Sequence, residues 1–141
     1  MFYNMPIGKP KDTLKGVVSI PKKILIVEDD PSFSRAITYI VQKEGYDVIS
    51  ASNGMAGLRM AKDEKPDLLI LDVMLPGLDG FEICSRLRQD PLTAKLPIIM
   101  LSAKGQEVDK TTGLKVGASE YLTKPIDRAL LLEKITSLLN K

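Results

Sequence analysis

From residue 24 onward, short apolar runs alternate with helical hydrophobic patterns, and no other feature of the chain limits its fold so strongly. We expect strands at about 24–28, 46–50, 67–72, 97–101 and 119–122, and helices at about 31–44, 53–64, 79–90, 105–116 and 127–140. The run that opens after Pro66 is apolar from 68 to 71, as is typical of a strand buried on both faces. Five strand–helix units with short connections imply right-handed crossovers. We therefore predict an α/β fold with a doubly wound, five-stranded parallel sheet and five helices.

Several helix starts can be assigned from single residues. Asp30 can cap the first helix, with Pro31 at the first helical position, where proline loses no hydrogen bond. Asn53 is a suitable cap for the second helix, and Asp79 or Gly80 opens the third. We interpret Asp30 as a helix cap rather than as a ligand.

Polar side chains follow four of the expected strands. The first is followed by Glu28 and Asp29, the third ends in Asp72, the fourth is followed by Ser102 and the fifth by Lys124. In an open parallel sheet, ligands bind outside the carboxyl ends of the strands. The repeated placement therefore favours a common site over unrelated surface acids.

The residue types at this edge indicate phosphoryl transfer. Three carboxylates packed together repel one another unless a cation joins them, and oxygen-only ligands favour Mg²⁺ over zinc. Lys124 adds a movable positive charge, and Ser102 adds a hydroxyl donor. Such a set positions and neutralises a phosphoryl group. Asp72 would be the nucleophile, because carboxylates can form aspartyl phosphates. Taken alone, Ser102 could be a loop residue and Lys124 a surface lysine.

Composition excludes some classes of function. The chain has no histidine, so it has no imidazole base, no zinc–histidine site and no phosphohistidine. One cysteine, Cys84, cannot form an internal disulfide; we expect it to be a buried thiol in a cytoplasmic protein. No apolar run is long enough to span a membrane. Residues 1–23 carry five lysines against one aspartate, too short and too poor in arginine to argue for direct nucleic-acid binding.

From residue 22 to the C-terminus, the chain resembles the receiver domain of two-component response regulators. We expect residues 1–21 to be a flexible N-terminal extension and residues 22–141 to be the receiver domain. The resemblance is carried, in order and at the expected spacing, by Ile24-Leu-Ile-Val-Glu-Asp-Asp30, Pro66-Asp-Leu-Leu-Ile-Leu-Asp-Val-Met-Leu-Pro-Gly-Leu-Asp-Gly80, Pro97-Ile-Ile-Met-Leu-Ser-Ala103 and Gly117-Ala-Ser-Glu-Tyr-Leu-Thr-Lys-Pro125.

The resemblance implies a flavodoxin-like strand order, 2-1-3-4-5, and a role for each polar residue at the edge. Asp72 would accept a phosphoryl group from a histidine kinase or a histidine phosphotransfer protein. Glu28 and Asp29 would organise Mg²⁺ or Mn²⁺, together with Asp72 and the backbone carbonyl of Met74. Such a domain is not a conventional enzyme, although it catalyses its own aspartyl phosphorylation and dephosphorylation.

The resemblance also implies a switch. Ser102 and Lys124 would bind the phosphoryl oxygens, and Tyr121, by default a core or half-buried aromatic, would take part in the conformational change. We further expect the Lys124–Pro125 peptide bond to be cis, which would turn the lysine into the site. The helix after Ser102 contains the weak helix formers Thr111-Thr112-Gly113, as a marginal switch element requires.

By the same resemblance, Met74 and Lys104 border the path of the water that attacks the phosphoryl group. Neither side chain is suited to orient that water, so we expect slow self-dephosphorylation. The alternative is that both side chains point to solvent and have no effect on the lifetime.

Other functions fit the sequence less well. A flavodoxin-type electron carrier needs a phosphate loop where this chain has Glu28-Asp-Asp-Pro31, and a haloacid-dehalogenase-type phosphatase needs an aspartate where it has Met74. A pseudo-receiver binding module would lack some of the acids or Lys124. We expect a single-domain regulator with a downstream protein partner, and phosphorylation could drive formation of a homodimer. The alternative is the receiver part of a longer response regulator or hybrid kinase.

Overall fold

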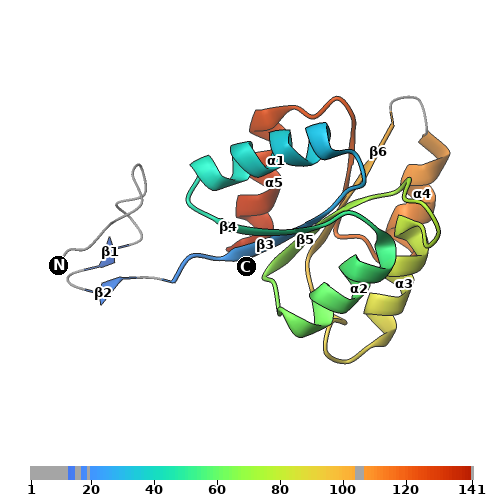
Figure 1. Ribbon diagram of the computed structural model, residues 1–141, viewed down its shortest axis with the longest axis horizontal. Coiled ribbons are helices and arrows are strands. Elements are labelled where there is room, and N and C mark those ends of the chain that lie inside the picture. Colours follow the sequence, from blue (N-terminus) through green and yellow to red (C-terminus); the bar gives the residue numbers. More distant parts are fainter. Residues whose placement is uncertain (1–12, 15–16, 19, 104–106, 141) are drawn as a thin grey trace.

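The computed structural model describes residues 13–14, 17–18, 20–103 and 107–140. Its centre is a sheet of five parallel strands, in the order β4-β3-β5-β6-β7 (Figure 1). These strands are β3 (Lys23–Val27), β4 (Asp47–Ala51), β5 (Leu68–Asp72), β6 (Ile98–Ser102) and β7 (Glu120–Thr123). Counted along the chain from residue 23, this is the order 2-1-3-4-5. The predicted fold class and strand order are confirmed.

Helices cover both faces of this sheet. On one face lie α1 (Pro31–Lys43) and α5 (Arg128–Leu139); on the other lie α2 (Gly54–Asp63), α3 (Gly80–Gln89) and α4 (Glu107–Lys115) (Figure 1). Alternate residues of each strand face opposite sides. In β3, Ile24 and Ile26 pack in the core beneath α1 and α5, whereas Leu25 and Val27 pack in the core beneath α2 and α3. This double burial explains why the strands are apolar at nearly every position.

Helix caps fix where several connections end. Asp30 accepts a hydrogen bond from the backbone N–H of Ser32 at 3.0 Å, Asn53 caps α2 at 2.9 Å, and Asp79 caps α3 at 3.0 Å. The predicted caps are therefore confirmed. Asp30 and Asn53 follow β3 and β4 by three and two residues, so these strand ends lie close to the starts of α1 and α2.

Outside this sheet, β1 (Thr13–Leu14) and β2 (Val17–Val18) form a separate antiparallel pair. Most of the N-terminal extension, and with it any test of its expected flexibility, lies outside the described residues. Within the part of the chain that the structure describes, no helix combines the length and apolar character needed to cross a bilayer.

Candidate functional site

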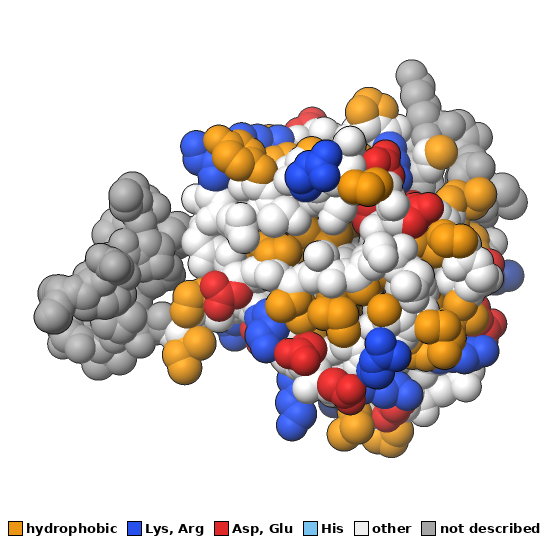
Figure 2. All heavy atoms as spheres, viewed as in Figure 1, with side chains coloured by type: hydrophobic (Ala, Val, Ile, Leu, Met, Phe, Trp, Pro, Cys, Tyr) orange, Lys and Arg blue, Asp and Glu red, His pale blue; other side chains and the backbone are white. Residues whose placement is uncertain are grey.

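The sheet brings the predicted polar residues to its carboxyl edge. Strands β3 and β5 are neighbours, and Val27 is paired with Leu71. Glu28, which follows Val27, and Asp72, which follows Leu71, therefore lie side by side. Acidic side chains gather on the surface between the start of α1 and the loop that precedes α3 (Figure 2). The strand order, rather than proximity in sequence, therefore builds the site.

Three carboxylates form the centre of this edge. Glu28, Asp29 and Asp72 each offer a carboxylate oxygen, and these oxygens lie within 4.8 Å of one another. Glu28 and Asp72 are both 3 % exposed, whereas Asp29 is exposed. The cluster is thus buried on one side and open to solvent on the other, as entry of a hydrated cation requires. Its all-oxygen chemistry fits Mg²⁺.

Lys124 lies against the two buried acids. Its ammonium Nζ is 3.1 Å from Glu28 Oε1 and 3.4 Å from Asp72 Oδ1. The Lys124–Pro125 bond is cis, which confirms that prediction, and the backbone N–H of Lys124 donates to the Ser102 carbonyl at 2.7 Å. The lysine backbone is therefore anchored to the end of β6, next to the strand that carries Asp72.

Burial dominates the electrostatics of the two acids. It raises the pKa of Glu28 and of Asp72, and it outweighs the hydrogen bonds and the Lys124 charge that favour their ionised forms. Burial also opposes the charge on Lys124, but its hydrogen bond to Glu28 and the charge of Asp72 prevail, and together they raise the pKa of this lysine. The site therefore keeps its ammonium charged and favours binding of a further cation by the acids.

The remaining predicted site residues are Ser102, Met74, Tyr121 and Lys104. Ser102 is buried at the end of β6, where its hydroxyl donates to the Ala103 carbonyl at 3.4 Å. The backbone N–H of Met74 hydrogen-bonds the Asp72 carboxylate, but the Met74 side chain is 61 % exposed. Tyr121 is buried in the core beneath α4. Lys104 lies outside the described residues.

One residue near the site, Phe33, was not predicted from the sequence. Phe33, in the first turn of α1, places its ring 4.2 Å, measured to the centroid, from Lys124 Nζ. Its signal was available: an aromatic residue in the first turn of a helix that starts directly after the acidic pair. An apolar ring is neither a ligand, a nucleophile nor a base, so the polar pattern of the strand ends does not identify it.

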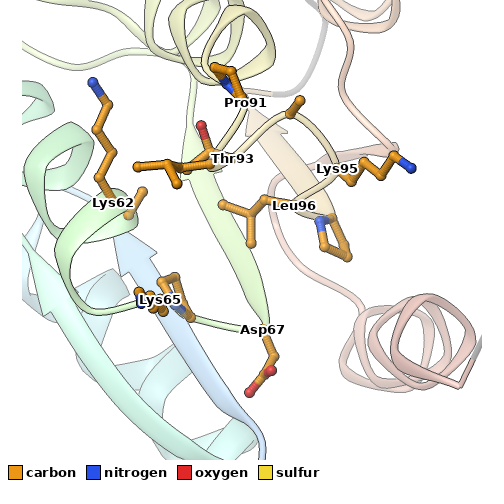
Figure 3. Close-up of a pocket in the computed structure, with 12 residues that line it drawn as sticks. Lys62, Lys65, Asp67, Pro91, Thr93, Lys95 and Leu96 are labelled. Carbon is orange, nitrogen blue, oxygen red and sulfur yellow. The ribbon is translucent and has the colours of Figure 1, made fainter.

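A cavity of about 480 Å³ lies at the opposite edge of the sheet, between the end of α2 and the loop that joins α3 to β6. Lys62 and Lys95 extend away from each other, and the Asp67 carboxylate also points outward (Figure 3). Lys62 is paired with Asp90 at 3.2 Å. The cavity thus lacks the converging charges found at the carboxyl edge, and it does not compete as the chemical site.

Comparison with known proteins identifies the family. The sequence model of the response regulator receiver domain matches residues 24–136. The chain belongs to the response regulator receiver family. All four motifs on which the resemblance rested, and the residues of the acidic cluster, lie within the matched residues. The match agrees with the rejection of the two other classes considered, a flavodoxin-type electron carrier and a dehalogenase-type phosphatase.

Relatives of this receiver domain differ in length. The alkaline phosphatase synthesis transcriptional regulatory protein PhoP of Bacillus subtilis is 47 % identical over 120 residues, which cover 85 % of this chain and 49 % of PhoP. Protein PilH of Pseudomonas aeruginosa is 41 % identical over 117 residues, covering 83 % of this chain and 97 % of PilH. The chain thus spans about half the length of relatives such as PhoP and nearly all of PilH.

One solved structure of a similar receiver domain contains a magnesium ion. The receiver domain of the sensor histidine kinase PA1611 from Pseudomonas aeruginosa PAO1 superimposes with a TM-score of 0.80 at 30 % identity. The match covers 86 % of this chain and all of that one. That structure has a magnesium ion coordinated in its active-site cleft.

Proposed function

We propose that this receiver domain is a phosphorylation-activated signalling switch, in which Asp72 accepts a phosphoryl group from a histidine kinase or a histidine phosphotransfer protein. The observation that carries the proposal is the contact between the Asp72 carboxylate and the Lys124 ammonium at 3.4 Å, inside a cluster of three carboxylates. A nucleophile thus lies beside the positive charge that the transferred group needs.

The proposed reaction balances without an added reductant or oxidant. An Asp72 carboxylate oxygen attacks phosphorus, the bond from phosphorus to the donor's imidazole nitrogen breaks, and its electron pair stays on the imidazole, which takes up a proton. Lys124 is close enough to neutralise charge on the phosphoryl oxygens. Ser102 is at the neighbouring strand end and would donate its hydroxyl after turning away from Ala103.

The proposal includes a divalent cation. Glu28, Asp29, Asp72 and the backbone carbonyl of Met74 would hold Mg²⁺ or Mn²⁺, which supplies positive charge to the phosphoryl oxygens when bound. The all-oxygen donor set and the close approach of the three carboxylates support this assignment. The magnesium ion in the receiver domain of PA1611 supports it further.

Phosphorylation would change the contacts of the site. A phosphoryl group adds about −1.5 to −2 charges and several acceptor oxygens. Lys124 would exchange its Glu28 contact for the new oxygens, and Ser102 would follow, which moves the loops after β6 and β7. Tyr121 lies in β7, and β7 contacts α4, so we propose that Tyr121 and α4 transmit the change to a protein partner.

The test is labelling with acetyl phosphate in the presence and absence of Mg²⁺. We expect one phosphoryl group per chain, only with the cation, and none in Asp72→Asn. The matched control is Asp67→Asn, at the other end of the same strand segment, where the amide oxygen can still accept from the Lys23 N–H. Acid-stable label that persists in Asp72→Asn would contradict the assignment, and a wild type that is never labelled would favour a binding module.

The pathway requires a separate experiment. PhoP is a transcriptional regulator twice as long as the matched region, and PilH is covered almost entirely, so relatives of both kinds exist. We propose a receiver at residues 22–141 that acts as a single-domain regulator. Phosphotransfer profiling against the histidine kinases of the source organism would identify the donor. A polypeptide from that organism that migrates well above 15.5 kDa under denaturing conditions would contradict the single-domain form.

A further inference from the structure

We infer that Phe33 is a positioning residue for Lys124, whose ammonium its ring face holds at the phosphoacceptor. The inference rests on the proposed function, since it assigns a residue to the same reaction. Lys124 Nζ has three partners on three different parts of the fold: Glu28 at 3.1 Å, Asp72 at 3.4 Å and the Phe33 ring centroid at 4.2 Å.

The distance is that of a cation–π contact. A lysine ammonium within about 6 Å of a ring centroid is attracted by the negative face of the ring, and the attraction is stronger where water is excluded. Phe33 is half-buried and packs against the core beneath α1 and α5, and Lys124 is 26 % exposed. The contact is therefore partly shielded from solvent.

The position of the ring is itself well fixed. Phe33 lies in the first turn of α1, just after the Asp30 cap and Pro31, so the backbone that carries it is anchored at the start of the helix. The lysine side chain, by contrast, is a long flexible stem with a compact charge. A fixed ring beside a flexible ammonium restricts where that ammonium can go.

A phenyl ring suits this role because it has no lone pair. It attracts the ammonium without accepting its N–H groups, which stay available to carboxylate or phosphoryl oxygens. The contact can therefore persist when Lys124 exchanges Glu28 for a phosphoryl oxygen. A carboxylate in place of Phe33 would compete for the ammonium, and an aliphatic residue would fill the space without attracting it.

The chain offers an internal control. On the same helix, the Lys43 ammonium lies 5.4 Å from the Tyr39 ring, but this pair is exposed and belongs to the other end of α1. Substitution of Tyr39 removes a cation–π contact from the same helix without touching the carboxyl edge of the sheet.

The experiment compares rates of phosphorylation by acetyl phosphate with Mg²⁺ present, each variant first being shown to unfold cooperatively. We expect Phe33→Leu, which keeps an apolar side chain but has no ring, to be slower by about three- to tenfold. Phe33→Tyr keeps the ring face and should restore the rate. Tyr39→Leu should match the wild type. A wild-type rate in Phe33→Leu would overturn the inference.

A double-mutant cycle separates positioning from a structural effect. In the Lys124→Met background, Phe33→Leu should change the residual rate by less than twofold, because the ammonium on which the ring acts is gone. An undiminished loss in that background would show that Phe33 acts through the fold instead, and would overturn the inference.

A second readout does not depend on phosphorylation. In the resting protein, the ring of Phe33 should shift the NMR signals of the terminal methylene protons of Lys124 upfield, and the shift should vanish in Phe33→Leu but survive in Phe33→Tyr. If the wild type is never labelled, the proposed function fails, and this shift alone decides whether Phe33 holds Lys124. Unshifted Lys124 signals in the wild type would overturn the inference.

Discussion

Glu28 and Asp72 are buried beside each other at the end of the sheet, where the Lys124 ammonium contacts both. Two buried carboxylates with one cation leave a net negative charge in a poorly hydrated place, which costs folding free energy. The same excess charge attracts a divalent cation. At the scale of single residues, the site is thus arranged for binding at the expense of stability.

This cost predicts a stabilising substitution. Because the pKa of Asp72 is raised in the folded protein, its contribution to stability is complete below the unfolded value of 3.8 and is lost as the pH rises through the folded value. Asp72→Asn should therefore raise the melting temperature at pH 7, without divalent cations, by roughly 2–5 °C. Thermal unfolding in EDTA at pH 7 and below pH 4 tests this.

At the lower pH, the gain from Asp72→Asn should shrink, because the wild-type acid is then neutral as well. Asp67→Asn serves as the control, since the Asp67 carboxylate is half-exposed and bonded to the Lys23 backbone N–H. Equal melting temperatures for Asp72→Asn and wild type at pH 7 would show that burial of this charge is not costly.

The lifetime of the phosphoryl group is a further prediction for single residues. Met74 is apolar and Lys104 cannot accept a proton while charged, so neither should orient an attacking water. We expect slow decay in the wild type with Mg²⁺, and faster decay in Met74→Asn and Lys104→Glu. The Met74 side chain is exposed, as expected for the alternative in which it points to solvent and has no effect on the lifetime. If neither substitution changes the decay, these positions do not control water access.

At the scale of elements, the close packing of α4 on Tyr121 depends on Gly113. A Cβ atom at Gly113 would lie 2.6 Å from a ring carbon of Tyr121 and 3.0 Å from the Met100 sulfur. The glycine therefore lets the helix sit directly on the aromatic ring. Gly113 is a weak helix former, as expected from the sequence, but its close packing on Tyr121 is the stronger reason for its presence.

Gly113→Ala should accordingly destabilise the protein, although alanine favours a helix by about 1 kcal/mol over glycine. We expect a net loss of about 1–2 kcal/mol, because Tyr121 must shift to admit the new methyl group. The neighbouring Thr111→Ala, at an exposed position of the same helix, should instead gain a few tenths of a kcal/mol. Urea unfolding measures both, and a Gly113→Ala protein as stable as wild type would refute the packing argument.

Elements were predictable where a local rule decides them. The caps at Asp30, Asn53 and Asp79 act within three residues, and the described helices α1, α2, α3 and α5 start and end within one residue of expectation. The contact between Phe33 and Lys124 was not predictable in this way, because it joins residues that only the completed sheet brings together. The hydroxyl direction of Ser102 depends on local geometry that periodicity does not encode.

At the scale of the whole molecule, cation binding should be visible as stability. A ligand that binds only the folded state raises its stability by mass action, by about 1.4 kcal/mol at a concentration ten times its Kd. We expect millimolar Mg²⁺ to raise the melting temperature of the wild type, but to have little effect on Asp29→Asn. Asp29 is chosen because it is exposed, so its substitution should disturb the core least.

The control for this prediction is KCl at matched ionic strength, which should not reproduce the effect of Mg²⁺. Asp67→Asn, at the other edge of the sheet, should respond as the wild type does. An equal rise in Asp29→Asn would place the cation elsewhere on the molecule.

Lys124 contacts Glu28 across 96 residues of chain. During synthesis, the ribosome releases the acidic residues first and the lysine last, so a growing or prematurely stopped chain holds the acids without their counter-charge. Such a chain has the proposed nucleophile but lacks the Lys124 charge that helps to neutralise the group to be transferred. Competence to receive the signal would thus report that translation has passed the final strand, and unfinished copies would not compete with complete ones for the cell's kinase.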